Sequence, residues 1–158
     1  MKTVYIALGS NLGDRAGNLQ QARDKIQSPH LKIVRASSIY ETAPRDLLDQ
    51  PWFLNQVVAV ETTLFPRQLL ARLQGIEKEM GRQRVIANGP RIIDLDILLF
   101  GSLLTHAPGL EIPHPRMAER RFVLEPLAEL APALRHPRTG QTMRQLLAQT
   151  LDQPVRPL

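Results

Sequence analysis

Two aspartates stand two residues apart in a segment that is otherwise apolar after its first residue, Arg91-Ile-Ile-Asp-Leu-Asp-Ile-Leu-Leu-Phe100. Charge in an apolar segment is costly unless a cation, a metal ion or a raised pKa compensates it. In a β-strand, Asp94 and Asp96 would project from the same face, about 6–7 Å apart at the Cα. Carboxylate oxygens favour Mg²⁺, Mn²⁺ or Ca²⁺ over zinc. We therefore interpret the pair as a metal platform, although many Asp-X-Asp triplets are only solvated or salt-bridged. On the opposite face we expect core positions at Ile93, Leu95, Ile97 and Leu99.

Arginines flank the aspartates along the chain: Arg82, Arg84 and Arg91 precede them, and Arg116, Arg120 and Arg121 follow. Any one of these arginines could simply form a surface ion pair, which contributes little to stability. As a group they outnumber the two aspartates, so a metal-bound polyphosphate accounts for them better. Phosphoryl transfer is the chemistry that this indicates, because it depends mainly on positioning and charge stabilisation. The sequence has no Gly-x-x-x-x-Gly-Lys-Ser/Thr motif. We interpret Gly9-Ser-Asn-Leu-Gly13 as a strand-to-helix turn rather than a phosphate loop.

Composition limits the classes of protein to consider. The chain has 158 residues, 43% of them hydrophobic, which fits one domain over residues 1–158. It has no cysteine, which excludes disulfides and a thiol nucleophile. The net charge of +5 indicates an anionic partner, but only 4% of the residues are aromatic, which argues against nucleic acid. No apolar run approaches the roughly 20 residues of a membrane span. We expect a cytoplasmic monomer that binds small molecules and neither nucleic acid nor membrane.

The hydrophobic pattern predicts an α+β fold. We expect strands at residues 3–8, 31–40, 54–64 and 91–100, and helices at about 19–26 and 66–80, the second starting at Pro66 and capped by Gly81. The order βαββαβ is that of a ferredoxin-like core, an antiparallel sheet with helices on one face. C-terminal helices should follow at about 122–130 and 141–150, with a fraying tail after them. Residues 42–51 contain two prolines and should form a long loop.

Three motifs in this order resemble the 6-hydroxymethyl-7,8-dihydropterin pyrophosphokinases of folate biosynthesis. They are Gly9-Ser-Asn-Leu-Gly-Asp-Arg15, Gly89-Pro-Arg-Ile-Ile-Asp-Leu-Asp-Ile-Leu-Leu-Phe-Gly101 and Ile112-Pro-His-Pro-Arg-Met-Ala-Glu-Arg-Arg-Phe-Val-Leu-Glu-Pro-Leu127. The resemblance implies a ferredoxin-like enzyme that moves the β,γ-diphosphate of ATP to the pterin hydroxymethyl group and releases AMP. It also implies that Asp94 and Asp96 hold two Mg²⁺ ions with ATP as co-substrate.

The resemblance further implies roles for individual residues. The catalytic residues would be Arg82, Arg91, Asp94 and Asp96. ATP would contact Gln74, Glu77, Arg82, Arg84, Arg91, Ile97, His114, Arg116 and Arg120. The pterin would bind between the rings of Phe53 and Phe122, with its polar edge against Thr42, Pro44, Arg45 and Asn55. Two positions depart from the family pattern: Asn88 stands where a tryptophan is frequent, and Phe53 stands where tyrosine is also found. Without the resemblance, the phenylalanines could be core residues and His114 could stabilise a turn.

Two other interpretations of the sequence stay open at this point. A non-catalytic RNA- or nucleotide-binding domain can have a ferredoxin-like fold and a basic isoelectric point. A metal-dependent nucleotide hydrolase or glycosyltransferase could use the same acid pair. Binding driven by charge would persist in EDTA and weaken with salt, and a hydrolase or glycosyltransferase would not require pterin.

Overall fold

The computed structural model describes residues 1–44, 49–81 and 90–158. Along the chain the elements are β1 (Lys2–Ser10), α1 (Arg15–Ile26), β2 (Leu31–Ala36), β3 (Tyr40–Thr42), β4 (Phe53–Thr62), α2 (Pro66–Glu79), β5 (Asp94–Phe100), β6 (Thr105–Ala107), β7 (Leu110–Ile112), the 3₁₀ turn η1 (Met117–Glu119), α3 (Arg121–Leu130), α4 (Met143–Ala148) and β8 (Val155–Pro157). No helix in these ranges is long and apolar enough to cross a membrane.

The main sheet is antiparallel and has the order β5-β1-β4-β3-β8, with β2 also paired to β4. The predicted strand over residues 31–40 is therefore two strands, β2 and β3, which both pair with β4. Between them the Ser37 hydroxyl accepts a hydrogen bond from the Val57 N–H at 3.0 Å. The Ser37 N–H still donates to the Val57 carbonyl at 2.9 Å, so the side chain takes the place of one of the two backbone hydrogen bonds where the strand is interrupted.

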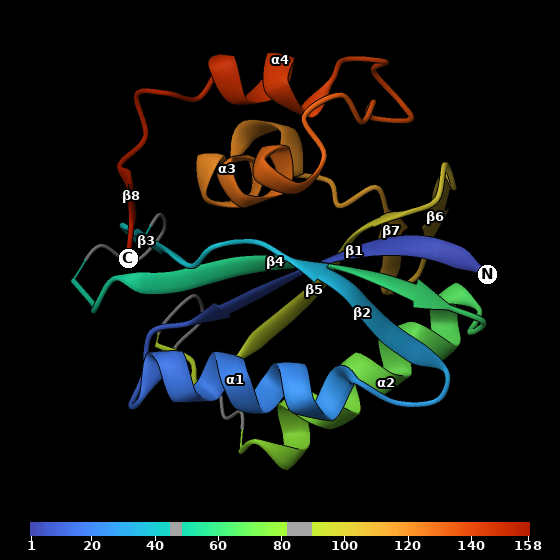
Figure 1. The fold of residues 1–158 in the computed structure, drawn as a ribbon, viewed down its shortest axis with the longest axis horizontal. Coiled ribbons are helices and arrows are strands. Elements are labelled where there is room, and N and C mark those ends of the chain that lie inside the picture. The colour runs from blue at the N-terminus through green and yellow to red at the C-terminus, as the bar shows by residue number, and fades with distance from the viewer. Residues whose placement is uncertain (45–48, 82–89) are drawn as a thin grey trace.

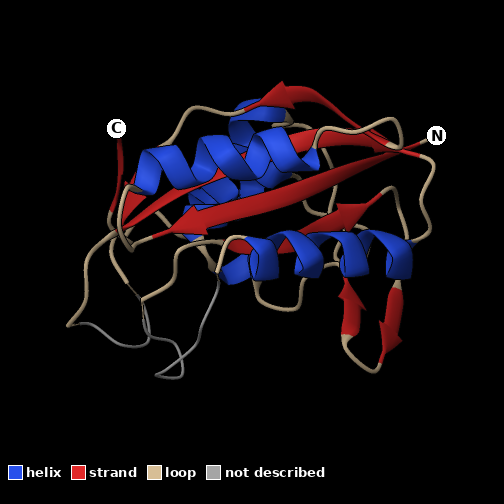
Figure 2. Cartoon of the chain, turned by 90° about the horizontal axis from the view of Figure 1, so that it is seen from below, coloured by secondary structure: helices blue, strands red, loops and turns tan. Residues whose placement is uncertain are grey.

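Helices cover both faces of this sheet (Figure 1). Helices α1 and α2 lie on one face, side by side across the strands (Figure 2), and α3 and α4 lie on the other. The α2 helix begins with Pro66 at its first turn, and Gly81 follows with a φ of +79°, as its sequence predicts. Two apolar clusters fill the layers: one includes Leu19 and Leu73 beneath the sheet, and the other includes Val57 and Leu124 above it.

An irregularity in β5 changes which face its last residues occupy. Tyr5 pairs with Leu99, but Ile6 pairs with Ile97, so Leu98 is an extra residue on β5. This is the geometry of a β-bulge, which shifts the alternation by one position. The predicted placement of Leu99 beside Ile97 is therefore wrong, because Leu99 packs in the cluster on the α3 face.

The C-terminal third also differs from the predicted elements. The last helix is short, Met143–Ala148, and the tail that we expected to fray forms β8, which pairs with β3. A two-stranded hairpin, β6 and β7, was not predicted. It extends away from the main sheet (Figure 2), and Arg67 of α2 donates a hydrogen bond to the Pro108 carbonyl at its tip. Short strands such as these carry too few residues for a period-two pattern to stand out.

Candidate active site

The aspartate pair faces a cavity whose floor is the middle of the sheet. In the strand register, Asp94 lies opposite Gly9, which lies opposite Asn55, and Asp96 lies opposite Ala7. Directly opposed residues share one face of a sheet. The cavity is lined by Ala7, Leu8, Gly9, Thr42, Ala43, Pro44, Gln50, Phe53, Asn55, Arg91, Asp94, Asp96, Leu98, His114, Arg120, Phe122 and Val123. Both aspartates therefore point to the same side, as strand alternation predicted.

Gly9 keeps this floor low, because a side chain at this position would crowd the side chains of Asn55 and Phe53. A Cβ atom at this position would lie 3.0 Å from the Asn55 side-chain oxygen and 3.7 Å from the Phe53 ring. The short side chains of β1 thus leave space between the carboxylates on β5 and the polar and aromatic groups on β4.

Arg91 compensates the first of the two carboxylates. Its guanidinium donates to the Asp94 carboxylate at 3.0 Å, and the side chains of Arg91 and Asp94 are only 14% and 22% exposed. The guanidinium also lies over the Phe53 ring, 6.0 Å from its centroid. Among the described residues, the Arg91 Nε is a buried nitrogen with no hydrogen-bond partner. A buried cationic donor of this kind suits an anionic ligand in the cavity.

Two phenylalanine rings and a small polar group form the other side of the cavity. Phe53 begins β4 and Phe122 lies in the first turn of α3, and the guanidinium of Arg120 lies 5.4 Å from the centre of the Phe122 ring. The Asn55 amide donates to the Thr42 hydroxyl, which fixes its orientation. This side is suited to a flat ring with a polar edge.

His114 lines this cavity and also an adjoining one. The second cavity is bounded by Leu70, Asp96, Ile97, residues 106–112, His114 and Pro115. Burial lowers the pKa of His114, and the nearby charge of Arg120 lowers it further. Its Nδ1 accepts a hydrogen bond from the Arg116 backbone N–H at 3.2 Å. In the neutral ring, Nε2 therefore carries the proton and is a donor.

Several predicted site residues lie elsewhere or outside the described ranges. The carboxylate of Glu77 is buried and accepts a hydrogen bond from the Leu95 N–H at 2.8 Å. It thus supports β5 between the two aspartates. Gln74 is exposed on α2, and Arg116 is exposed before η1. Neither lines the two cavities. Arg45, Arg82 and Arg84 lie outside the described residues, as does the departure at Asn88.

Sequence reasoning did not single out Asn11 or Gln50. Asn11 is buried; its backbone N–H donates to the Arg91 carbonyl at 3.1 Å, and its side-chain oxygen accepts from the Arg91 N–H at 2.7 Å. Its side-chain amide donates to the side-chain oxygen Oε1 of Gln50 at 2.8 Å and to the Pro51 backbone carbonyl at 3.0 Å. Asn11 thus joins the segment before β5 to the segment before β4. The position of Asn11 within Gly9-Ser-Asn-Leu-Gly13 was the available signal.

The donor set in the cavity fits a hard divalent cation that is shared with a ligand. Among the described residues, no group of three or more His, Cys, Asp or Glu side chains could hold a metal ion by itself. Two carboxylates on one strand face are nevertheless the usual protein contribution to Mg²⁺ bound with phosphates, because Mg²⁺ keeps waters and takes phosphate oxygens as further ligands. Asp94 and Asp96 are the residues that would hold it.

A ferredoxin-like sheet with paired carboxylates, arginines and phenylalanine rings around the same cavity defines an enzyme of the phosphotransferase class. The model of the 7,8-dihydro-6-hydroxymethylpterin-pyrophosphokinase (HPPK) family matches residues 5–132. The chain belongs to this family. The motif resemblance is thereby confirmed, together with the family's reaction, pyrophosphoryl transfer from ATP to hydroxymethyldihydropterin in folate synthesis.

Similar proteins differ greatly in length. The chain is 44% identical over 157 residues to the folic acid synthesis protein fol1 of Pneumocystis carinii, covering 99% of this chain but 21% of that protein. It is 47% identical over 149 residues to the 2-amino-4-hydroxy-6-hydroxymethyldihydropteridine pyrophosphokinase of Pseudomonas aeruginosa, covering 94% and 91%. A solved HPPK-DHPS triple mutant of Plasmodium falciparum superposes with a TM-score of 0.75 at 18% identity, over 94% of this chain and 43% of that one. This last likeness concerns the fold alone.

Proposed function

We propose that this chain uses the cavity above β1, β4 and β5 to transfer the β,γ-diphosphate of ATP to 6-hydroxymethyl-7,8-dihydropterin, with Asp94 and Asp96 holding two Mg²⁺ ions. One observation carries the proposal: the two carboxylates and the two phenylalanine rings line one cavity. An acceptor ring and a polyphosphate can thus be bound side by side. We further propose that the chain is a single-domain, monomeric, cytoplasmic enzyme.

The pterin would bind on the aromatic side. Phe53 and Phe122 come from different elements and line the same cavity, so a flat ring can stack against both. Asn55 and Thr42 are hydrogen-bonded to each other and would read its polar edge, with Pro44 completing the wall. Arg45, which lies outside the described residues, stays a prediction for this side. Stacking on aromatic side chains contributes about 1–3 kcal/mol for a nucleobase, and we expect a similar value for a pterin.

The phosphates would bind on the acidic side, where cations surround the carboxylates. Arg91 and Arg120 line the cavity, and the proton on Nε2 of His114 suits donation to a phosphate oxygen. Ile97 lines the adjoining cavity, where the nucleoside would extend. We assign Arg82, Arg84, Arg116, Gln74 and Glu77 to the ATP side as well, Glu77 through its support of β5. This distribution of charge favours the transition state by positioning and electrostatics.

When bound, Mg²⁺ would neutralise phosphate charge and lower the pKa of the attacking hydroxyl. Among the described cavity residues no strong base is available. Asp94 is paired with Arg91, and His114 uses Nδ1 to accept the Arg116 N–H. We therefore expect the hydroxyl proton to leave to solvent or to a phosphate oxygen. Attack on the β-phosphorus then breaks the bond to the α-phosphate and leaves AMP.

A nucleotide assay tests the proposal directly. The chain is incubated with Mg-ATP with and without hydroxymethyldihydropterin, and the nucleotides are separated. We expect AMP only when both pterin and Mg²⁺ are present, and no AMP after EDTA treatment. ADP as product, or turnover without pterin, would support a hydrolase or another transferase instead. Binding to RNA that persists in EDTA and weakens steeply with salt would favour a binding domain.

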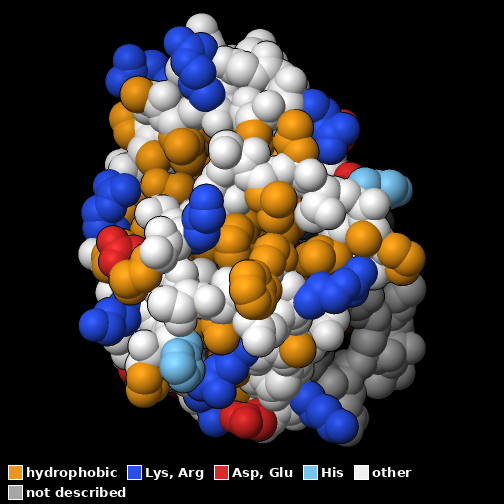
Figure 3. Space-filling model, turned by 90° about the vertical axis from the view of Figure 1, so that its right-hand side faces the viewer, with side chains coloured by type: hydrophobic (Ala, Val, Ile, Leu, Met, Phe, Trp, Pro, Cys, Tyr) orange, Lys and Arg blue, Asp and Glu red, His pale blue; other side chains and the backbone are white. Residues whose placement is uncertain are grey.

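The face shown in Figure 3 does not support that last alternative. On this face basic side chains are scattered singly or in small groups, and apolar side chains gather in the middle. A continuous basic stripe, which nucleic-acid binding would use, does not run across this face.

A further inference from the structure

The C-terminal strand β8 completes the edge of the sheet beside the aromatic side of the cavity. Thr42 pairs with Val155, Glu41 with Arg156, and Tyr40 with Pro157. The Leu158 N–H then donates to the Ile39 carbonyl at 3.1 Å. In Figure 1 this strand descends from the helical layer of α3 and α4 to the sheet, where it meets β3. The end of the chain is therefore adjacent to Thr42, a residue of the cavity wall.

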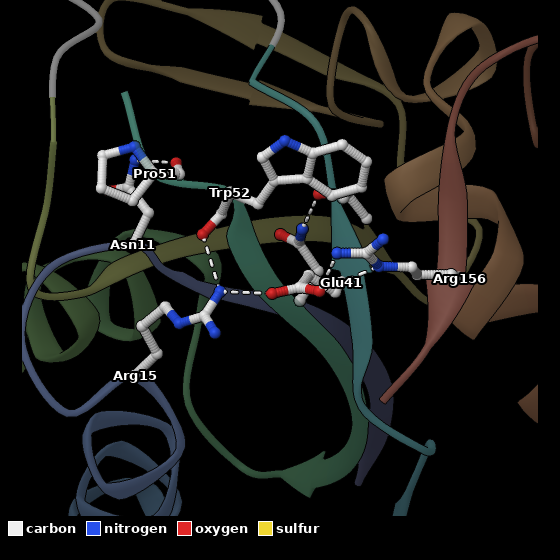
Figure 4. Close-up of polar contacts among 8 residues, drawn as sticks. Asn11, Arg15, Glu41, Pro51, Trp52 and Arg156 are labelled. Atoms are coloured by element: carbon white, nitrogen blue, oxygen red, sulfur yellow. Dashed lines mark hydrogen bonds and ion pairs between the residues drawn. The ribbon is translucent and has the colours of Figure 1, made fainter. Parts of the chain in front are cut away.

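Arg156 links this strand to the segment before β4. Its guanidinium donates two hydrogen bonds to the Glu41 carboxylate, at 2.9 and 2.6 Å. The same guanidinium lies over the Trp52 ring, 4.4 Å from its centroid. Glu41 also accepts a hydrogen bond from Arg15 at 2.8 Å, and Arg15 donates to the Trp52 carbonyl at 2.9 Å. Figure 4 shows that these contacts form a closed group around Trp52.

We call Arg15, Glu41 and Arg156 the Trp52 clamp. It holds Trp52 at two points, the carbonyl through Arg15 and the ring through Arg156, and Glu41 holds both arginines. The two cations lower the pKa of the Glu41 carboxyl, Arg15 most strongly. This agrees with an ionised carboxylate that accepts hydrogen bonds from both arginines. The side chain of Arg156 is 62% exposed, so its ion pair should add little to overall stability. Its effect should be local.

The local effect reaches the cavity through the backbone. Successive side chains of extended chain project to opposite faces. Trp52 contacts the clamp, of which Arg15 is the first residue of α1, and Phe53, the next residue, lines the cavity on the other face. Fixing the ring and carbonyl of Trp52 therefore fixes the direction in which the Phe53 ring leaves the chain. Just before Trp52, Asn11 donates to the Pro51 backbone carbonyl and to the Gln50 side chain.

We infer that Arg156 is a positioning residue for the pterin: through Glu41 and Trp52 it orients Phe53, so that its loss weakens pterin binding and leaves the phosphoryl-transfer step unchanged. The inference rests on the proposed function for the identity of the ligand. It adds a role for the C-terminal strand, which contributes no residue of its own to the cavity lining. The aromatic side would thus depend on a segment far from it in sequence.

The test compares Arg156→Ala with wild-type protein in steady-state kinetics, for pterin and ATP separately. We expect the KM for pterin to rise about fivefold, a modest change suited to one exposed cation–π and ion-pair group. The kcat and the KM for ATP should stay within about twofold. The KM for pterin of Arg156→Lys should lie between those of wild type and Arg156→Ala, because lysine keeps the charge but lacks the planar guanidinium. The matched control is Arg144→Ala, which removes an exposed arginine on α4 and should change none of these constants.

Trp52 supplies a second readout, because it is the only tryptophan of the chain. Its fluorescence should change in Arg156→Ala and stay as in wild type in Arg144→Ala. The double variant Glu41→Gln/Arg156→Ala should raise the KM for pterin by less than the product of the single changes, because the two residues act through one contact.

Several outcomes would overturn the inference. These are an unchanged KM for pterin in Arg156→Ala, unchanged Trp52 fluorescence, or equal increases in KM for both substrates with a lower unfolding midpoint. The last result would indicate a general structural role. If wild-type protein neither binds pterin nor forms AMP with it, the proposed function falls, and the positioning role falls with it. If wild-type protein is active and Arg156→Ala leaves the KM for pterin unchanged, only the positioning role is wrong.

Discussion

The two sides of the cavity are built in different ways. The acidic side comes from one strand: Asp94 and Asp96 are two residues apart in β5, which pairs with β1 and is supported from the other face by Glu77. The aromatic side combines residues from β3, β4 and α3, and polar side chains hold it. The first arrangement is fixed by regular strand pairing, and the second requires several specific contacts. Substitutions on the acidic side should therefore nearly abolish catalytic turnover, and substitutions on the aromatic side should weaken pterin binding by graded amounts.

The largest effect should come from the acidic side. Replacing Asp96 by alanine removes one of the two proposed ligands for Mg²⁺ and should lower kcat at least about a thousandfold, or about 4 kcal/mol. Stability should change little, because two neighbouring carboxylates repel each other and one is removed. The measurement is AMP formation at saturating Mg²⁺, with unfolding followed in urea. Asp24→Ala on the exposed face of α1 is the matched control. Turnover of Asp96→Ala close to wild type would show that the metal platform is wrong.

On the aromatic side the largest effect should come from Phe122. Its replacement by alanine removes one stacking face, and we expect the dissociation constant for pterin to rise about 10- to 100-fold. ATP binding should change much less. Calorimetric titrations with pterin and with ATP measure the two dissociation constants separately. Phe65→Ala makes the same chemical change on a ring that is 73% exposed, and it should leave both constants unchanged. Equal losses of ATP and pterin binding in Phe122→Ala would contradict the division of the cavity into two sides.

A smaller effect is expected where the two sides meet. Gly9→Ala would place a methyl group 3.0 Å from the Asn55 oxygen, so Asn55 must move, and we expect the KM for pterin to rise by roughly three- to tenfold, or about 1 kcal/mol. The matched control is Gly75→Ala in α2, where nothing lies within 4 Å of the new methyl group. That change should leave activity intact and raise the free energy of unfolding by about 0.5–1 kcal/mol, because alanine favours the helix. If Gly9→Ala bound pterin like wild type, the floor would be less tightly packed than these distances indicate.

The same difference between the two sides explains how far the sequence could predict the molecule. The face shared by Asp94 and Asp96 follows from a period of two residues, and the main helices and central strands follow from similar patterns. The position of Leu99 does not follow from the period of two, because one bulge at Leu98 reverses the alternation. Strand β8 also escaped prediction, because its partner β3 lies more than a hundred residues away in the chain. For Phe53 and Phe122 the residue pattern alone favoured the core over the cavity. Only the resemblance to a family distinguished the two.

The smallest expected effect concerns pH and the Trp52 clamp. Hydrogen bonds from Arg15 and then Arg156 lower the pKa of Glu41 below its ordinary value of 4.5. A group with a lower pKa in the folded state stabilises the fold above its unfolded pKa, and this contribution is lost as pH falls through the folded pKa. The free energy of unfolding of wild-type protein should therefore exceed that of Glu41→Gln at pH 6, and the difference should shrink as the pH is lowered below about 4.5. Urea denaturation between pH 6 and 3 measures it. A difference that stays constant over this range would show that Glu41 stabilises the aromatic side by packing rather than by its charge.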